Sequence, residues 1–298
     1  MPSYNIIRAG TILNKTKRRD PWFLDDYTIN PYSGCSYNCL FCYIRGSKYG
    51  EHMERSMSVK ENAVELLSKQ LALRAKKNQF GIIVLSSATD PYLQAERETQ
   101  ITRKILEVIL EYRFPVHIIT RSNLVVRDFD LIREINDNAI LPPDLEGKIP
   151  AKAIITFSFS TLDDNIARMF EPGATPPSLR LKCFQEAISF GFYSGISLMP
   201  LLPFISDSPD NLEQFYSVFA AAGAKYIFPE SITLFGDGPA ASKTLMMRAV
   251  DHYFPELSDR YRNLFANGYQ IDRNYHKALT DRISAVRKKY NIPDRILT

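Results

Sequence analysis

The sequence predicts an α/β protein built on a parallel sheet, and two observations support this fold class. Short apolar runs of strand length alternate with longer segments in which apolar residues recur at helical spacing. Each apolar run then ends in a string of polar residues, and continuous apolar runs are typical of strands buried on both faces. This alternation predicts consecutive parallel strands joined by helices.

Six segments are predicted to form strands. The first, 26–33, runs into a cysteine-rich loop, and the second, 81–85, is a continuous apolar run. The other strands are expected at 116–120, 153–159, 195–202 and 225–228. Helices are expected at about 58–77, 101–112, 128–135, 178–188 and 210–222. Ser58 and Glu61 have the spacing of a capping box, which would start the first helix.

Three parts are predicted along the chain. Residues 1–24 are expected to form an irregular lead-in, 25–237 to hold the sheet with its helices, and 238–298 to form a helical extension. Apolar residues in the extension fall at i, i+4, i+7 and i+11, namely Leu279, Ile283, Val286 and Tyr290.

The composition is that of an ordinary globular protein, with 45% hydrophobic and 23% charged residues. No apolar run approaches the roughly 20 residues of a membrane span, so no membrane association is expected. The formal charge of +4 permits a polyanionic partner without requiring one. Three basic clusters, at 15–19, 76–77 and 287–289, are interpreted as solvated faces rather than phosphate tracks. The N-terminal residues lack an apolar segment, and the cysteines form no disulfide framework, so a cytoplasmic location is expected.

The segment 30–43, Asn-Pro-Tyr-Ser-Gly-Cys-Ser-Tyr-Asn-Cys-Leu-Phe-Cys-Tyr, contains three of the four cysteines. Cys35, Cys39 and Cys42 have the spacing C-x3-C-x2-C, which suits a compact, soft metal group. An iron–sulfur cluster fits this spacing better than zinc does, because zinc sites usually contain two ligand pairs. Three thiolates would leave one iron of a four-iron cluster open to an external ligand. The alternative is a structural zinc site completed by His52.

With Phe41 before the third cysteine, this motif resembles the signature of the radical S-adenosylmethionine (SAM) superfamily. Within it, 30–43 is similar to the spore photoproduct lyase-like (DNA repair photolyase-like) branch. The segments 89–109 (TDPYLQAERETQITRKILEVI) and 161–181 (TLDDNIARMFEPGATPPSLRL) support the resemblance, which covers about residues 13–290. It implies a partial six-stranded (β/α)6 TIM-like barrel, a [4Fe-4S] cluster and SAM as cofactors, and an external one-electron reductant of the flavodoxin or ferredoxin type.

The resemblance also implies an activity. The reduced cluster would cleave the sulfonium C–S bond of SAM, and the resulting 5′-deoxyadenosyl radical would abstract hydrogen from the substrate in a lyase-like reaction. A nucleic-acid substrate, as in DNA repair, is the family-level expectation. Radical modification of a peptide or small metabolite is the first alternative. A non-catalytic iron–sulfur or zinc protein that binds nucleic acid is the second.

Sites of parallel α/β proteins lie at the carboxyl ends of the strands, so the polar residues after each apolar run are the candidates. The resemblance implies that the three cysteines hold the cluster and that Phe41 lies beside the adenine, with Tyr43 close by. The amino group of SAM would meet the segment Ser86, Thr89 and Asp90. Arg121 is the candidate for its carboxylate, and Ser158 and Ser160 for its ribose. For Asp90 the alternative is a structural role in an Asp-Pro turn.

The chain departs from spore photoproduct lyase at one position. The lyase uses an extra cysteine just after the second strand as hydrogen donor, whereas residues 85–88 here are Leu-Ser-Ser-Ala. The fourth cysteine, Cys183, is predicted to be a buried structural thiol on a helix. This difference argues against lyase activity on spore DNA itself. No catalytic residue is assigned, because nothing selects among the nearby tyrosines Tyr32, Tyr37, Tyr43 and Tyr92.

Overall fold

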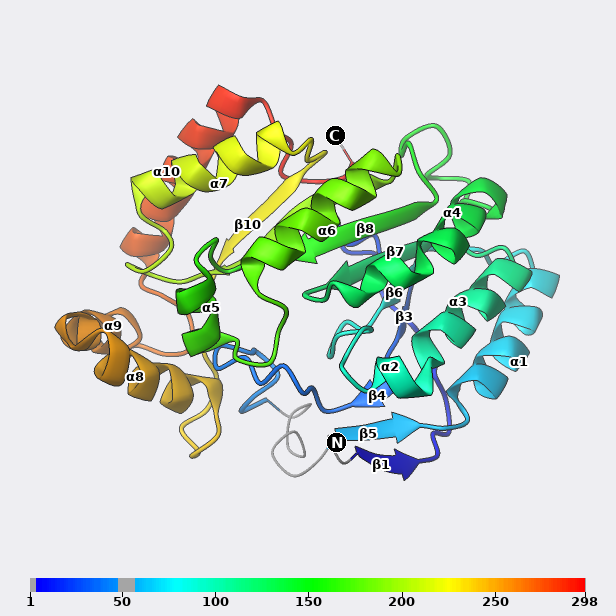
Figure 1. Ribbon diagram of the computed structural model, residues 1–298, viewed down its shortest axis with the longest axis horizontal. Helices are drawn as coiled ribbons and strands as arrows, with labels where there is room; N and C mark the ends of the chain where they lie inside the picture. The colour runs from blue at the N-terminus through cyan, green and yellow to red at the C-terminus, as the bar shows by residue number, and fades with distance from the viewer. Residues whose placement is uncertain (1–3, 48–56, 298) are drawn as a thin grey trace.

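A computed structural model of the chain describes residues 4–47 and 57–297. A seven-stranded sheet has the strand order β10-β9-β8-β7-β6-β3-β2 (Figure 1). Its strands are β2 (Leu13–Lys15), β3 (Tyr27–Ile29), β6 (Ile83–Leu85), β7 (Val116–Thr120), β8 (Ala153–Ser158), β9 (Tyr193–Leu201) and β10 (Ile227–Ser231). All neighbours from β3 to β10 are parallel, and β2 joins β3 in antiparallel orientation. The α/β class is thereby confirmed, as are five of the six predicted strands and, for its first part, the strand predicted at 26–33. In the described part of the chain the sheet is open between β2 and β10.

Helices connect the parallel strands and cover the outer face of the sheet (Figure 1). They are α1 (Ala63–Lys76), α2 (Glu96–Thr99), α3 (Ile101–Glu111), α4 (Phe129–Asn138), α5 (Asp164–Phe170), α6 (Pro177–Ser189) and α7 (Pro209–Ala221). A short 3₁₀ turn, Leu124–Asp128, precedes α4. α1 packs against α3, and α3 packs against α4. Each parallel strand from β6 to β10 is therefore followed by a helix, as the alternation in the sequence predicts.

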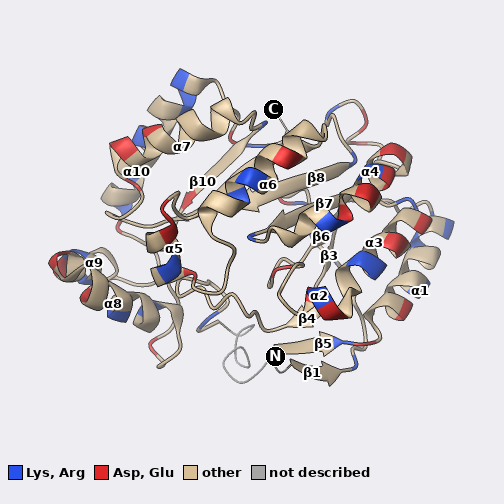
Figure 2. Cartoon of the chain, in the orientation of Figure 1, with Lys and Arg blue, Asp and Glu red and all other residues tan. Residues whose placement is uncertain are grey.

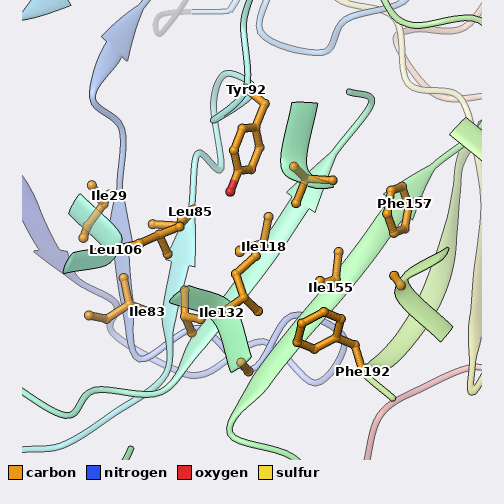
Figure 3. Packing of buried hydrophobic residues seen from close by; sticks show 14 of the residues in the cluster. Ile29, Ile83, Leu85, Tyr92, Leu106, Ile118, Ile132, Ile155, Phe157 and Phe192 are labelled. Carbon is orange, nitrogen blue, oxygen red and sulfur yellow. The ribbon is translucent and has the colours of Figure 1, made fainter. Parts of the chain in front are cut away.

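Side chains alternate between two environments along the parallel strands. Residues such as Ile83, Ile118 and Ile155 point outward into the main core, where helix residues such as Leu106 and Ile132 meet them (Figure 3). The intervening residues point inward and line a cavity, and among them are Val84, Ser86, Ile119, Arg121, Ser158, Ser197 and Met199. Because the side-chain period of a strand is two, one face can be apolar while the other carries the polar site.

The N-terminal region departs from the prediction. Residues 1–24 are not wholly irregular, because β1 (Tyr4–Ile7) pairs with β5 (Met57–Lys60) and β2 pairs with β3. The predicted strand 26–33 is divided, and its second part, β4 (Tyr32–Ser33), joins β5 in a separate three-stranded sheet. These strands are very short and pair with distant segments, so local sequence carries little signal for them.

The predicted capping box is wrong. Ser58 lies within β5, where its backbone pairs with β1 and β4, and α1 begins only at Ala63. Asn62 precedes the helix, but its side chain exchanges hydrogen bonds with the backbone of Ala9, at 2.9 Å in each direction. Sheet pairing over residues 57–60 therefore overrides the local capping pattern.

The residues predicted to form a helical extension, 238–298, contain helices and short turns. These elements include α8 (Ser242–Tyr253), a 3₁₀ turn (Pro255–Leu257), α9 (Ser258–Leu264) and α10 (Arg273–Tyr290). α10 packs against α7, and residues of α8 and α9 share a buried cluster with Phe41 of the cysteine loop. No helix in the described ranges is both long and apolar enough to cross a membrane.

Aromatic and polar side chains close the amino-terminal end of the sheet's inner face. Tyr226 stacks on Phe228 with ring centroids 4.5 Å apart. The Tyr226 hydroxyl lies 2.6 Å from that of Thr156, which lies 2.6 Å from Nε2 of His117. Nδ1 of His117 contacts the carbonyl of Phe23 at 2.8 Å, so this chain of polar contacts fixes the segment around residue 23 beneath the sheet.

Gly195 on β9 makes room for this arrangement. A Cβ atom there would lie 2.3 Å from the Tyr226 ring, closer than real contacts allow. We expect Gly195→Ala to destabilise the protein by about 1–3 kcal/mol through overpacking. Thermal unfolding under anaerobic conditions should show a melting temperature several degrees lower. Gly10→Ala is the matched control, because a Cβ atom at that position would meet no other atom within 4 Å. Equal melting temperatures for the two variants would contradict this packing role.

Candidate active site

The three clustered cysteines lie together after β4. Cys35, Cys39 and Cys42 line one cavity of about 540 Å³ on the inner side of the sheet. Within the described residues, no three His, Cys, Asp or Glu side chains converge as the ligands of a single metal ion would. The three thiols therefore do not meet around a single metal position, and they lie at separate places on the cavity wall. His52, the fourth ligand of the zinc alternative, lies outside the described residues.

A four-iron cluster suits this donor set. Its irons occupy separate corners, so its thiolate ligands need not converge. Burial raises the pKa of Cys35 to about 12 and that of Cys39 well above its ordinary value. Bare thiolates are therefore unfavourable in this cavity, whereas a bound metal centre deprotonates its thiols outright. The chemistry of the three donors thus fits an iron–sulfur cluster.

Backbone contacts with the end of α5 hold the cysteine loop in place. The N–H of Leu40 donates to the carbonyl of Phe170 at 2.8 Å, and that of Gly173 donates to the carbonyl of Tyr37 at 2.9 Å. A Cβ at Gly173 would lie 2.3 Å from the carbonyl oxygen of Ser36. Only glycine permits this close approach, which explains its place in the Phe-Glu-Pro-Gly sequence of 170–173.

Most of the residues predicted to contact SAM line the same cavity. The predicted residues that line the cavity with the cysteines are Phe41, Tyr43, Ser86, Thr89, Asp90, Arg121 and Ser158. Ser160 does not line the cavity, because it is fully buried and donates to Glu171 at 3.3 Å. Tyr43 stays half exposed at the cavity, and its hydroxyl donates to the carbonyl of Ser87 at 2.5 Å.

Two hydroxyl groups in the cavity are without hydrogen-bond partners among the described residues. They are Oγ of Ser86 and Oγ1 of Thr89, both shielded from solvent. Ser86 is 5% exposed and has a φ of +59°, in the left-handed region that only a few per cent of non-glycine residues adopt. Buried hydroxyls normally find a partner, and strained backbone gathers at functional sites. These features indicate a ligand position beside the cysteines.

Asp90 is heavily engaged by the fold itself. Its Oδ1 accepts hydrogen bonds from the N–H of Tyr92 and the hydroxyl of Thr120, both at 2.8 Å, and its Oδ2 accepts from the N–H of Arg121 at 2.7 Å. Burial raises its pKa to about 6, and these donors oppose that rise. The contacts are those of the structural alternative, in which Asp90 fixes the turn after β6 to the end of β7.

Arg121 belongs to a buried charge cluster that sequence reasoning missed. Its guanidinium donates to Oε2 of Glu171 at 2.5 Å and to the carbonyl of Met199 at 2.8 Å. Arg180 is fully buried and bonds to Oε1 of the same carboxylate and to the carbonyl of Ser158. Burial alone would raise the pKa of Glu171, but the two arginines hold it below its ordinary value. Both Glu171 and Arg180 fall in the segment 161–181 that supports the family resemblance, and this was the available signal.

The cluster also reaches the cysteine loop. The Arg121 guanidinium lies 5.3 Å from the centre of the Phe41 ring, within cation–π range. Its positive charge lowers the pKa of Cys39 and Cys42, against the larger opposing effect of burial. Arg121 therefore supplies the cavity's cysteine end with a fixed positive charge.

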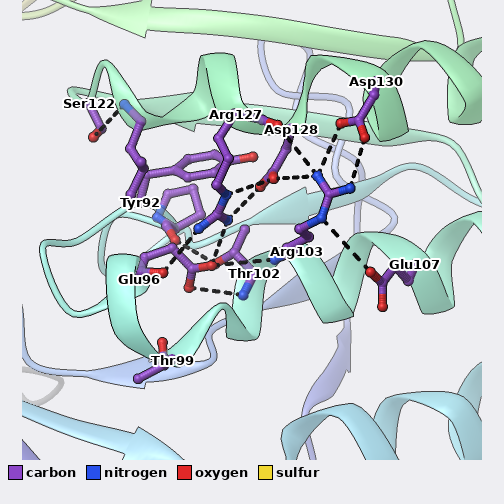
Figure 4. Close-up of polar contacts among 12 residues, drawn as sticks. Tyr92, Glu96, Thr99, Thr102, Arg103, Glu107, Ser122, Arg127, Asp128 and Asp130 are labelled. Carbon is purple, nitrogen blue, oxygen red and sulfur yellow. Dashed lines mark hydrogen bonds and ion pairs between the residues drawn. The ribbon is translucent and has the colours of Figure 1, made fainter.

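Glu96, another polar residue after the second predicted strand, belongs to a separate network (Figure 4). Arg127 donates to Oε1 of Glu96 at 2.8 Å. Glu96 also accepts hydrogen bonds from Tyr32 and Thr102, and Arg127 also donates to Asp128. Arg103 joins Asp128 and Asp130 at 3.0 and 2.8 Å. None of these residues lines the cavity, so the network ties α2 and α3 to the turn before α4.

Two further parts of the cavity lining were also missed by sequence reasoning. They consist of residues that precede β3 and others that end β10, namely Asp20, Phe23, Asp25, Glu230, Ser231, Ile232 and Thr233. The expectation that polar residues follow strands could have found the β10 group. It could not have found residues 20–25, which reach the cavity from the opposite end of the sheet.

Comparisons with known proteins identify the family. The family model described as "Radical SAM superfamily" matches residues 29–216, more than half of the chain. The chain belongs to the radical SAM superfamily. An uncharacterised protein of Mycobacterium tuberculosis is 26% identical over 273 residues, covering 89% of this chain and 75% of that protein. An uncharacterised protein of Methanocaldococcus jannaschii is 26% identical over 185 residues, covering 61% and 62%.

Solved structures place this radical SAM protein beside spore photoproduct lyase in fold. A lyase variant with bound AdoMet and dinucleoside spore photoproduct matches with a TM-score of 0.63 at 14% identity, covering 96% of this chain and 78% of the other. SuiB of Streptococcus suis, bound to its precursor peptide SuiA, matches with a TM-score of 0.52 at 11% identity, covering 89% and 46%. At these identities the likeness concerns the fold.

Asp90 permits a direct test of its structural role. In Asp90→Asn, the amide NH₂ group would face one of the N–H or O–H donors whose hydrogen bond the carboxylate now accepts. We expect a loss of about 1–3 kcal/mol in the free energy of unfolding, the usual effect of leaving a buried donor unsatisfied. Urea unfolding of the anaerobic protein measures this loss. Unchanged stability, combined with weakened SAM binding in calorimetry, would instead support the predicted contact with the SAM amino group.

Proposed function

We propose that this radical SAM protein is an enzyme that reductively cleaves SAM and uses the resulting radical to abstract hydrogen from a substrate held in the 540 Å³ cavity. The observation that carries the proposal is that Cys35, Cys39 and Cys42 line this cavity together with buried, unpartnered hydroxyls. When bound, a [4Fe-4S] cluster and SAM supply one-electron cleavage of the sulfonium C–S bond, which gives methionine and a 5′-deoxyadenosyl radical. The electron comes from an external reductant of the flavodoxin or ferredoxin type.

The chain's own residues have separate tasks in this proposal. The three cysteines would hold the cluster, while Ser86 and Thr89 would donate to or accept from polar groups of SAM. Arg121 already donates to Glu171 and Met199, so it would attract the SAM carboxylate mainly by charge or through its remaining N–H groups. Phe41 and Tyr43 would flank the adenine. The closed floor of the sheet would keep water and stray hydrogen donors from the reacting atoms.

We also propose a partial barrel for residues 25–237, with 238–298 as its helical extension, as the order of the six parallel strands supports. The clustered cysteines favour a reducing cytoplasm as the location. The family-level expectation of a nucleic-acid substrate finds little support in the surface charges. Among the basic clusters, Arg19 pairs with Asp26 and Asp144, Arg287 with Asp294, and Lys289 with Glu213. Acidic and basic residues are mixed along the outer helices (Figure 2).

Cys39→Ala tests the proposed function. The anaerobically reconstituted wild-type protein should bind iron and sulfide, absorb visible light and convert SAM to 5′-deoxyadenosine when dithionite is added. We expect Cys39→Ala to lose both the chromophore and the cleavage, because two remaining thiolates anchor the cluster poorly. Liquid chromatography with mass spectrometry measures deoxyadenosine.

Cys183→Ala is the matched control. Cys183 is buried outside the cavity lining, with its sulfur 4.0 Å from the carbonyl of Asn123. This variant should keep the cluster and SAM cleavage and lose about 1 kcal/mol of stability. Normal iron, sulfide and SAM cleavage in Cys39→Ala would refute the proposed function.

A further inference from the structure

The floor of the cavity lies at the opposite end of the sheet from the cysteines. Asp20, Phe23 and Asp25 precede β3, whereas the cysteines follow β4, and all six residues line the same cavity. The contact between the Phe23 carbonyl and His117, near the start of β7, fixes the floor at the amino ends of the parallel strands. A substrate beneath SAM would therefore meet these three side chains.

Neither carboxylate of the floor has a cationic partner within the described residues. Asp20 accepts from the N–H groups of Trp22 and Phe23, at 2.8 and 3.0 Å, and Asp25 accepts from the N–H of Asp20 at 2.8 Å. By contrast, the fully buried carboxylates elsewhere in this fold that pair with arginine include Glu96, Asp128 and Glu171. The floor thus keeps negative charge that the protein itself leaves unbalanced.

The environment of the floor favours a positive ligand. Burial raises the pKa of Asp25, and the negative charges of Asp20 and Asp26 raise it further, so a bound cation would relieve both effects. The Phe23 ring also lines the cavity, and its position is fixed by an edge contact with Phe228 at 5.8 Å. An aromatic ring beside carboxylates is a common setting for ammonium and guanidinium groups.

The rest of the cavity supports the same charge preference. Glu230 adds another carboxylate to the lining, while Arg121 is the basic residue of the described lining and is bound to Glu171. The buried hydroxyl of Ser86, unpartnered among the described residues, lines the same cavity beside the cysteines, at the position proposed for SAM. Because no three described ligands converge on one point, an organic cation fits the floor better than a metal ion does.

We propose that Asp20, Asp25 and Phe23 bind a cationic nitrogen of the substrate, an ammonium or guanidinium group, at the floor of the cavity. The proposal rests on the proposed function, since it names the substrate class of the same site. It places amine-bearing metabolites and basic side chains of peptides ahead of nucleic acids, whose phosphates the carboxylates would repel.

Trp22, the chain's one tryptophan, offers a direct readout at this floor. It stacks on Phe228 at 6.4 Å, next to Phe23. We would titrate the reconstituted holoenzyme, saturated with SAM and without reductant, with pentylammonium chloride and follow tryptophan emission and calorimetric heat. Saturable binding of pentylammonium is expected, with no binding of the similarly sized neutral 1-pentanol or of the anion pentanoate.

Variants then locate the site. Asp25→Asn and Asp20→Asn should each weaken pentylammonium binding about tenfold to a hundredfold, the usual effect of removing one charged hydrogen-bond acceptor. Asn at position 20 keeps an oxygen for the N–H groups of Trp22 and Phe23, so the turn should be retained. Glu65→Gln is the matched control, because Glu65 lies on the surface of α1 and pairs with Lys69. It should bind pentylammonium as the wild type does.

Three outcomes would overturn the inference: no saturable binding of pentylammonium, equal binding by the wild type and both Asp variants, or, in a separate titration of cluster-loaded protein prepared without SAM, displacement of bound pentylammonium as SAM is added. The last would assign the floor to the ammonium group of SAM itself. The proposed function is judged separately, by wild-type conversion of SAM to deoxyadenosine. A wild type that cleaves SAM but binds no pentylammonium would refute the inference alone. A wild type that binds pentylammonium but cleaves no SAM would refute the proposed function.

Discussion

The buried carboxylate of Glu171 is the contact on which the cysteine end of the molecule depends. Through Arg121 it reaches the end of β7 and the carbonyl of Met199 on β9, and through Arg180 it reaches the last residue of β8 and helix α6. The same short segment holds the cysteine loop by backbone hydrogen bonds from Leu40 and to Tyr37. Removing one member of a buried ion cluster typically costs about 3–5 kcal/mol, because the remaining charges lose their compensation. One carboxylate thus aligns three strand ends with the loop.

This arrangement also sets the charge beside the thiols. At the carboxyl ends of the strands, Arg121 and Arg180 face two buried carboxylates, those of Glu171 and Asp90, so the charges of these four groups balance. Arg180 is fully buried against Glu171 and the carbonyl of Ser158, whereas the guanidinium of Arg121 lies over the ring of Phe41 in the cysteine loop. A cluster with thiolate ligands carries negative charge, and a fixed cation nearby stabilises it electrostatically. The cavity therefore has one fixed cation, Arg121, near the cysteines, whereas its floor carries carboxylates with no cationic partner among the described residues.

Whether the sequence predicts a feature of this structure depends on how far apart in the chain the interacting residues lie. The apolar runs report burial directly, so six parallel strands and their helices are predictable, and the spacing of Cys35, Cys39 and Cys42 predicts that they lie together. Ser58 and Glu61 mislead because pairing of β5 with a distant segment outweighs a local cap. The ion pairs of Glu171 and Arg180 cannot be predicted from the sequence, because either side chain could equally face solvent or pair with a helix neighbour. Only the fold brings them together with Arg121. Asp20 and Asp25 are missed because they approach from the end of the sheet where sites are not expected.

The two ends of the cavity also differ in how they are built. The cysteine end depends on strand ends, the buried charge cluster and a glycine with no space for a side chain, so changes there disturb several elements together. The floor is formed by a loop before β3 that is fixed by its own hydrogen bonds, among them those from the N–H groups of Trp22 and Phe23 to the Asp20 carboxylate and that between the Phe23 carbonyl and His117. None of these contacts involves the cysteine loop. Substitutions in residues 20–25 can therefore alter what the floor binds without moving the thiols, and the shared SAM chemistry can serve different substrates on the same scaffold.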